Sequence, residues 1–230
     1  MNLRADESLK CWVDLMSSGE NELMEREGLR MSNTSLPIVE TFHSVQGEGA
    51  WCGTNAYFIR LALCDVGCPW CDTKISWSDK KHPKITLETL TQQAKAANPH
   101  FVVITGGEPL IHDLTDLTQA LQSAGLRTHL ETSGSHPYSG SFDWITLSPK
   151  PFKPPIGDLY DRAHELKLII SNPEDFHWAE TQSNLTHPQA LRYLQPEWNA
   201  PTSQALVFDY VLKNPQWRIS LQTHKLLGVQ

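Results

Sequence analysis

The chain has 230 residues, of which 40% are hydrophobic and 20% are charged, and its formal net charge at pH 7 is −7. This is the balance of an ordinary soluble globular protein with one sizeable domain, and it excludes a disordered or fibrous chain. There is no basic stripe, and no apolar run approaches the roughly 20 residues that span a bilayer, so neither nucleic acid nor a membrane is expected as a partner.

The first 34 residues are polar and acidic and lack a strand pattern. We interpret residues 1–34 as an N-terminal extension that is disordered, helical around residues 20–30, or packed on the domain, which we expect at residues 35–230. The opening residues lack the basic start and apolar core of a secretory signal, which favours a cytoplasmic location. The cysteines agree with this, because five is an odd number and three of them lie within eight residues, as in a ligand cluster of a reducing compartment.

Short β-branched and aromatic runs, each followed by a polar, Gly- or Pro-rich cluster, have the length and composition of strands. They lie at residues 56–63, 101–105, 127–130, 144–147, 166–170, 190–194 and 217–221. Helical patterns cover residues 86–97 and 114–124, and Gly125 is a natural cap for the second.

Strands that alternate with helices predict parallel strands joined by crossovers, so that the polar clusters gather at the C-terminal end of the sheet. Active sites of barrel-like α/β folds assemble at that end. The crossover after Lys150 is short and Pro-rich and is not expected to hold a full helix. The predicted fold is therefore an α/β domain, an incomplete (β/α)6-type barrel.

Cys64, Cys68 and Cys71 form a C-x3-C-x2-C motif directly after the first of these strands. Thiolates suit zinc or an iron-sulfur cluster. A structural zinc site needs four ligands, and the nearest further candidates, Cys52 and His82, do not lie at a conventional spacing. Three cysteines fit a 4Fe-4S cluster that leaves one iron open to a small molecule. The spacing alone leaves open a zinc loop, or an electron-transfer cluster with a distant fourth ligand.

The motif resembles the signature of the radical S-adenosylmethionine (SAM) superfamily, in which SAM chelates the open iron. In that superfamily a GGE segment after the next strand binds the SAM amino group, and here Thr105-Gly106-Gly107-Glu108-Pro109 closes the strand at residues 101–105. Glycine there lets a ligand approach the backbone closely.

The flanking segments resemble one family within the superfamily, the 7-carboxy-7-deazaguanine synthases, over roughly residues 37–228. The most specific matches are Gln46-Gly47-Glu48-Gly49 and Cys71-Asp72-Thr73. Further matches are Phe58-Ile59-Arg60-Leu61, Glu131-Thr132-Ser133-Gly134, Ser148-Pro149-Lys150, Leu194-Gln195-Pro196 and Thr223-His224-Lys225.

The resemblance implies a radical SAM lyase that contracts the ring of 6-carboxy-5,6,7,8-tetrahydropterin to 7-carboxy-7-deazaguanine with loss of ammonia, a step toward queuosine in tRNA. It implies a 4Fe-4S cluster, SAM and Mg²⁺ as cofactors, an electron donor such as flavodoxin, and a homodimer. No side chain is expected to act as a catalytic acid or base, because the cofactors supply the reactivity.

The site residues that the resemblance implies fall into four groups. Substrate would contact Val45, Gln46, Gly47, Arg60 and Thr105, and the cluster would bind Cys64, Cys68 and Cys71. Mg²⁺ would bind Thr73, and SAM would contact Trp70, Cys71, Asp72, Gly107, Glu108, Ser133, Ser148, Pro149 and Lys150.

Arg60 lies within an apolar run, so it needs a partner, either a substrate carboxylate or an internal one such as Glu48 or Glu131. Glu108 either holds the SAM ammonium or caps the following helix, and Trp70 is also suited to shield the cluster.

Two features depart from the family pattern: the N-terminal extension, and Leu63 in the place where a glycine is more usual. Cys11 and Cys52 match no motif, and the roles of Gln195 and His224 stay open. The rival interpretations are a radical SAM activating enzyme that acts on a partner protein and a non-enzymatic zinc or iron-sulfur module.

Overall fold

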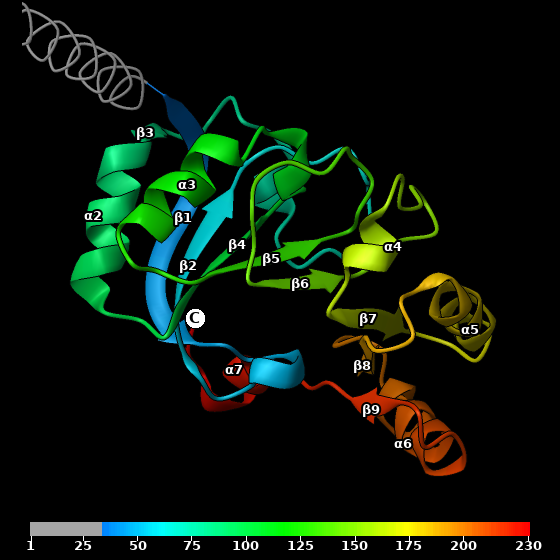
Figure 1. Ribbon diagram of the computed structural model, residues 1–230. Helices are drawn as coiled ribbons and strands as arrows, with labels where there is room; N and C mark the ends of the chain where they lie inside the picture. Colours follow the sequence, from blue (N-terminus) through cyan, green and yellow to red (C-terminus); the bar gives the residue numbers. More distant parts are fainter. Residues whose placement is uncertain (1–33) are drawn as a thin grey trace, which may run out of the picture.

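One nine-stranded sheet organises the chain, in the strand order β3-β1-β2-β4-β5-β6-β7-β8-β9 (Figure 1). The computed structural model describes residues 34–230. The expected extension, with its possible helix at residues 20–30 and Cys11, therefore lies outside the described residues, apart from Thr34.

The strands run parallel from β2 to β9, while β1 and β3 join the sheet antiparallel at one end. Their bounds are β1 Ser35–Val45, β2 Asn55–Leu61, β3 Lys84–Thr86, β4 Phe101–Gly106, β5 Thr128–Thr132, β6 Trp144–Leu147, β7 Glu165–Ile170, β8 Leu191–Pro196 and β9 Arg218–Ile219. Because β3 and β9 lie at opposite ends of the order and do not pair, the barrel is open. The expected incomplete α/β barrel is confirmed.

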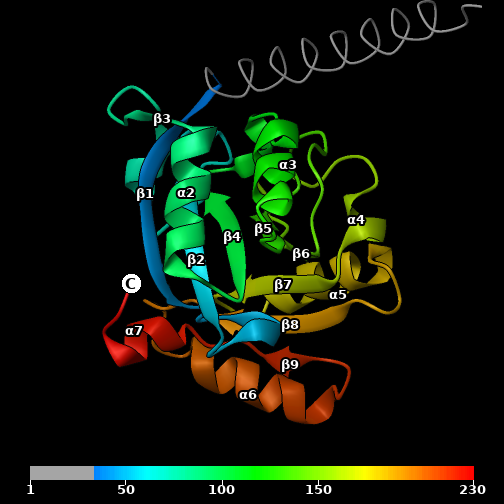
Figure 2. The same ribbon diagram turned by 60° about the vertical axis from the view of Figure 1, so that its left-hand side comes forward.

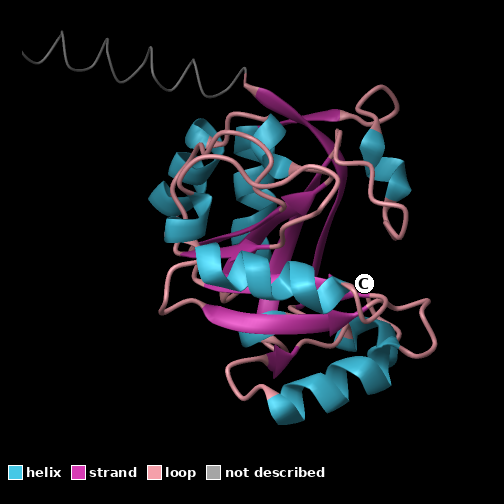
Figure 3. Cartoon of the chain, turned by 90° about the vertical axis from the view of Figure 1, so that its right-hand side faces the viewer, coloured by secondary structure: helices cyan, strands magenta, loops and turns pink. Residues whose placement is uncertain are grey.

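The helices cover the outer side of the curved sheet (Figure 3). They are α2 Leu87–Ala97, α3 Thr115–Ser123, α4 Leu159–Arg162, α5 Asp175–Leu185, α6 Ser203–Lys213 and α7 Thr223–Leu227, with 3-10 turns η1 Gly49–Trp51, η2 Lys74–Trp77 and η3 Pro109–Ile111. The Pro-rich crossover after Lys150 holds only the four-residue α4, as expected. None of the helices within residues 34–230 has the length and apolarity to cross a membrane.

The sequence patterns did not single out β1. Its residues, SLPIVETFHSV, are mostly half-buried and include a proline, so they lack both a clean alternation and a continuous apolar run. Pro37 is tolerated because it is the last residue of β1 that pairs with β3 and precedes Ile38, where the pairing with β2 begins. The strand matters for the site because it ends at Val45, immediately before the Gln46–Gly49 segment.

Side chains alternate between two environments along the central strands. Ile59, Leu61 and Ile104 point to the outer side and pack with α2 and α3 in the largest apolar cluster. Phe58 and Val103 point into the barrel and form a smaller apolar cluster. Toward the C-terminal ends of the strands the inward positions are polar, as Arg60 on β2 shows. The interior of the barrel thus holds an apolar cluster and is polar at the end where the loops meet.

Leu63 adopts a left-handed backbone conformation, with φ of 85°. The conformation follows from the contacts of its peptide groups, since its N–H donates to the Ser76 carbonyl at 2.7 Å and its carbonyl accepts from the Glu108 N–H at 2.9 Å. A non-glycine residue in this region costs about 1 to 2 kcal/mol.

We expect Leu63→Gly to be more stable than Leu63→Ala by about 1 kcal/mol, because both variants remove the side chain but only glycine relieves the backbone. At Gln92, an exposed position inside α2, the order is expected to reverse, since alanine is the better helix former. Urea unfolding of the four variants measures both differences. A Leu63→Ala variant as stable as Leu63→Gly would show that the backbone there is not strained.

Candidate active site

The three motif cysteines lie on the loop between β2 and η2, at the C-terminal end of the sheet. Cys64, Cys68 and Cys71 are free, half-buried thiols that line one cavity of about 290 Å³. Burial raises the pKa of the Cys64 and Cys68 thiols. Since iron binds thiolates, the loop holds these groups protonated until a metal offsets the cost of ionising them.

Gly106 and Gly107 bring the end of β4 against the cysteine loop. A Cβ on Gly106 would lie 2.2 Å from the Leu61 carbonyl oxygen, and one on Gly107 would lie 2.2 Å from that of Leu63 and 2.9 Å from Cys64 Cβ. The Gly107 N–H donates to the Leu61 carbonyl at 2.9 Å. The glycine pair is therefore required by the packing of the protein itself, in addition to any ligand that approaches it.

Glu108 is 1% exposed, and its carboxylate is occupied by protein donors. It accepts from the N–H groups of Leu110 at 3.1 Å and Ser133 at 2.8 Å, and from the hydroxyls of Thr132 and Ser133. It therefore caps η3, one of the two roles considered for it, and ties the end of β4 to the segment after β5.

A second group of polar residues forms the rim near the third cysteine. The Lys225 ammonium donates to Asp72 at 2.8 Å and to Gln222 at 2.9 Å, and the Thr73 hydroxyl donates to Asp72 at 3.2 Å. Burial alone would raise the pKa of Asp72, but Lys225 outweighs it and the pKa is lowered. In the segment after β6, the Lys150 ammonium donates to the Ser148 carbonyl and hydroxyl, each at 2.6 Å.

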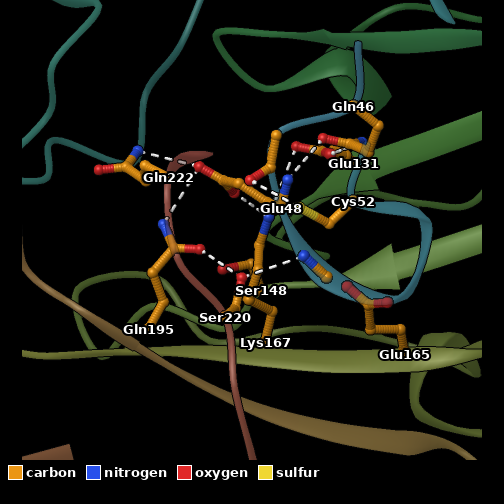
Figure 4. A network of polar contacts seen from close by, with 12 residues as sticks. Gln46, Glu48, Cys52, Glu131, Ser148, Glu165, Lys167, Gln195, Ser220 and Gln222 are labelled. Atoms are coloured by element: carbon orange, nitrogen blue, oxygen red, sulfur yellow. Dashed lines mark hydrogen bonds and ion pairs between the residues drawn. The ribbon is translucent and has the colours of Figure 1, made fainter. Parts of the chain in front are cut away.

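A buried ion pair connects the Gln46–Gly49 segment to β7. The Lys167 ammonium donates to Glu48 and lies 3.7 Å from Glu131. Glu48 also accepts from the side chains of Gln195 at 3.2 Å and Gln222 at 2.9 Å (Figure 4). Burial alone would lower the pKa of Lys167, but the surrounding carboxylates outweigh it and raise the pKa, so this ammonium stays charged.

The same network fixes the amide of Gln46. Its NH2 group donates to Glu131 at 2.8 Å and its oxygen accepts from the Glu48 N–H at 3.1 Å. One amide hydrogen and one lone pair remain for a ligand, since a primary amide offers two of each. Next to it, Gly47 leaves room for His224, because a Cβ there would lie 2.1 Å from His224 Nδ1.

Arg60 finds a partner that differs from both internal partners considered from the sequence. Its Nε donates to Glu40 at 2.8 Å, and neither Glu48 nor Glu131 pairs with it. The reason lies in the sheet register, in which Glu40 on β1 is directly opposite Arg60 on β2. Thr105 on β4 is its neighbour on the other side. The guanidinium lines the cavity, and its two terminal nitrogens form no ion pair with any of the described residues.

All residues expected to contact substrate, SAM, the cluster or Mg²⁺ line this cavity, except Pro149, which is buried. Trp70 lines it while its ring packs against Phe152, with centroids 5.1 Å apart. Sequence reasoning missed Lys167, Gln222 and the role of Lys225 as an ion-pair partner. Lys167 carried the same signal as Arg60, a cation within an apolar strand, whereas Gln222 carried none.

The donor set fits an iron-sulfur cube. Three free thiols on one loop face a cavity that has room for a further ligand. Within residues 34–230 no three His, Cys, Asp or Glu side chains are grouped tightly enough to hold a single metal ion. A cube does not require such a point, since each cysteine binds a different iron.

The chain is similar to known proteins over most of its length. The model of the radical SAM superfamily matches residues 59–176. The chain is 58% identical to the 7-carboxy-7-deazaguanine synthase of Synechocystis sp., over 85% of this chain and 94% of that protein. It is 33% identical to the synthase of Escherichia coli K12, over 84% and 98% of the two chains. The crystal structure of QueE from Escherichia coli is similar with a TM-score of 0.73 and 31% identity, covering 85% of this chain and 97% of that one.

Glu165 lies against the end of the Gln46–Gly49 segment. Its carboxyl group is expected to make the stability of the fold depend on pH. Burial raises its pKa to about 7, while its carboxylate accepts the Ala50 N–H at 2.8 Å. The folded state then holds a proton that the unfolded state releases between about pH 4.5 and pH 7, so stability falls as the pH rises through this range. Glu165→Gln keeps the acceptor and removes the ionisation. We expect its stability relative to the parent chain to grow over this range by up to about 3 kcal/mol and then level off.

Urea unfolding at several pH values between 5 and 8 measures this difference. The matched control is Glu88→Gln, at an exposed position of α2. A difference between Glu165→Gln and the parent that stays flat with pH would contradict the assignment.

Proposed function

The chain belongs to the 7-carboxy-7-deazaguanine synthase family of the radical SAM superfamily, and on that premise we propose that it contracts 6-carboxy-5,6,7,8-tetrahydropterin to 7-carboxy-7-deazaguanine and ammonia. The observation that carries this is the shared cavity, in which three free thiols on one loop face the same space as the guanidinium of Arg60. The rival interpretations, an activating enzyme or a non-enzymatic metal module, do not account for an internal cation paired across the sheet at that place.

Cys64, Cys68 and Cys71 would hold a 4Fe-4S cluster. SAM would lie between the cysteine loop and the ends of β4 to β6, beside Trp70, Asp72, Gly107, Glu108, Ser133 and the Ser148–Lys150 segment. When bound, the reduced cluster and SAM together supply a 5′-deoxyadenosyl radical. The protein's part is to orient the reactants and exclude water, and the occupied carboxylate of Glu108 supports a positioning role for that residue.

The substrate would lie between Arg60, Thr105 and the Val45–Gly47 segment. Two terminal nitrogens of Arg60 are available to form a bidentate pair with the substrate carboxylate, while Nε stays on Glu40. The remaining amide hydrogen and oxygen lone pair of Gln46 would form hydrogen bonds with the edge of the pterin ring.

Mg²⁺ would bind the Thr73 hydroxyl together with the substrate carboxylate and water, as suits a hard cation. The hydrogen bond from Thr73 to Asp72 supports this, since it places carboxylate oxygens close to the hydroxyl. The reduced thiols and an oxygen-labile cluster suit the cytoplasm, and the radical chemistry requires a one-electron donor such as flavodoxin.

Anaerobic reconstitution followed by a product assay tests the proposed function. We expect about four irons and four sulfides per chain, and 7-carboxy-7-deazaguanine when SAM, Mg²⁺, dithionite and the carboxytetrahydropterin are supplied. One zinc per chain, or absence of this product from a cluster-loaded protein, would overturn the proposal.

The same assay separates two roles of Arg60. We expect Arg60→Ala to lower kcat/KM for the pterin by about a hundredfold or more, the loss of a charge-assisted bidentate pair, while cleavage of SAM by the reduced cluster is largely retained. Glu40→Gln is the matched control, because it breaks the ion pair and leaves the guanidinium in place. If Glu40→Gln lowered kcat/KM as much as Arg60→Ala, Arg60 would be structural. The same conclusion would follow if Arg60→Ala also lost SAM cleavage.

We also propose a homodimer that buries the outer face of α6 and the edge strand β9. Phe208 and Leu212, one turn apart on α6, and Ile219 on β9 are exposed apolar side chains. Charges in such a patch oppose association, so Phe208→Glu/Leu212→Glu is expected to elute with the mass of one chain where the parent has the mass of two. Leu185→Glu, at another exposed leucine, is the control. A parent protein that is monomeric at micromolar concentration would contradict the proposal.

A further inference from the structure

Residues 74–84, named here the lysine loop, carry positive charge in an acidic protein. The segment KISWSDKKHPK holds four lysines, Lys74, Lys80, Lys81 and Lys84, and a single aspartate, while the whole chain has a net charge of −7. It begins three residues after Cys71, so it directly continues the loop that would hold the cluster. The turn that leads into β3 protrudes beyond the sheet (Figure 2).

The lysines of this loop are free to meet a partner. All four are exposed, and none forms an ion pair with another residue of the described part of the chain. Ile75, next to Lys74, is 66% exposed and adds an apolar side chain to this surface. Electron-transfer encounters use small interfaces, and complementary charge steers the approach of the partners.

The loop is also held firmly to the cysteine loop. The carbonyls of Ser76 and Trp77 accept from the N–H groups of Leu63 at 2.7 Å and Cys64 at 3.4 Å. The Ser76 hydroxyl donates to the Thr73 carbonyl at 2.7 Å, and the His82 ring contacts the Ile75 carbonyl at 2.8 Å. Its position relative to the cluster is therefore fixed before any partner binds.

The opposite flank of the cysteine loop offers no comparable free charge. There Lys153 donates to Asp65 at 2.6 Å, and His136 contacts the other oxygen of Asp65 at 3.0 Å. The exposed apolar Phe152 on that side is packed against Trp70. The charge that would attract an acidic partner is concentrated on the lysine loop.

We propose that the lysine loop is the docking surface for an acidic one-electron carrier of the flavodoxin class. This rests on the proposed function, which requires one electron per cleaved SAM. The reduced flavin of the carrier is oxidised by one electron, and the cluster on Cys64, Cys68 and Cys71 accepts that electron; no bond or proton moves between the proteins. Long-range attraction between the lysines and the carrier speeds the encounter and weakens as salt rises.

The test compares two reductants with the reconstituted full chain. In Lys80→Glu/Lys81→Glu, we expect turnover driven by a purified bacterial flavodoxin and its reductase to fall about tenfold or more at low salt, with dithionite-driven turnover within about twofold of the parent. The charge-matched control is Lys95→Glu/Arg127→Glu, at exposed positions of α2 and of the turn before β5, and the rescue is Lys80→Arg/Lys81→Arg. Both are expected to behave like the parent chain.

Direct binding supplies a readout that does not depend on turnover. By fluorescence anisotropy with labelled flavodoxin, affinity should fall in parallel for Lys80→Glu/Lys81→Glu and show a shallower salt dependence. Equal affinity and equal flavodoxin-driven turnover in this variant and the parent would overturn the inference, as would equal losses in the Lys95→Glu/Arg127→Glu control. If dithionite yields no product even with the parent protein, the proposed function fails instead, while the binding result still decides the docking surface.

Discussion

The buried pair between Lys167 and Glu48 is the constraint on which the site depends. It joins a loop near the start of the domain to β7 in its middle, and through Gln195 and Gln222 it reaches β8 and the segment before α7. An open barrel has no hydrogen bonds across its gap, so a polar link of this kind holds the two sides at a set spacing. Burying two charges costs free energy, and removing one partner of such a buried pair typically lowers the stability of the fold by about 3 to 5 kcal/mol.

The fold was predictable from the sequence wherever the information is local. Strand composition and the polar cluster after each strand located seven of the nine strands and the active end of the sheet. The antiparallel β1 was not predicted, because its half-buried residues show neither an alternation of apolar and polar residues nor a continuous apolar run. The cysteine spacing likewise singled out three thiols that the structure places on one loop, where they line the same cavity.

Partners that depend on register or on distant segments could not be predicted. Glu40 meets Arg60 only because β1 pairs antiparallel with β2 in one particular register. Gln222 reaches Glu48 from the far end of the chain. Glu108 looked equally suited to a ligand or to a helix cap, and only the positions of Thr132 at the end of β5 and of Ser133 directly after it show how its oxygens are used.

The wall formed by the segment around α7 has a consequence for the order in which the protein matures. Thr223 donates its N–H to the Gly47 carbonyl at 3.0 Å, and Lys225 reaches Asp72 beside the third cysteine. On the ribosome the cysteine loop emerges long before these residues do, so the rim beside Cys71 is completed only when the last segment of the chain packs against it.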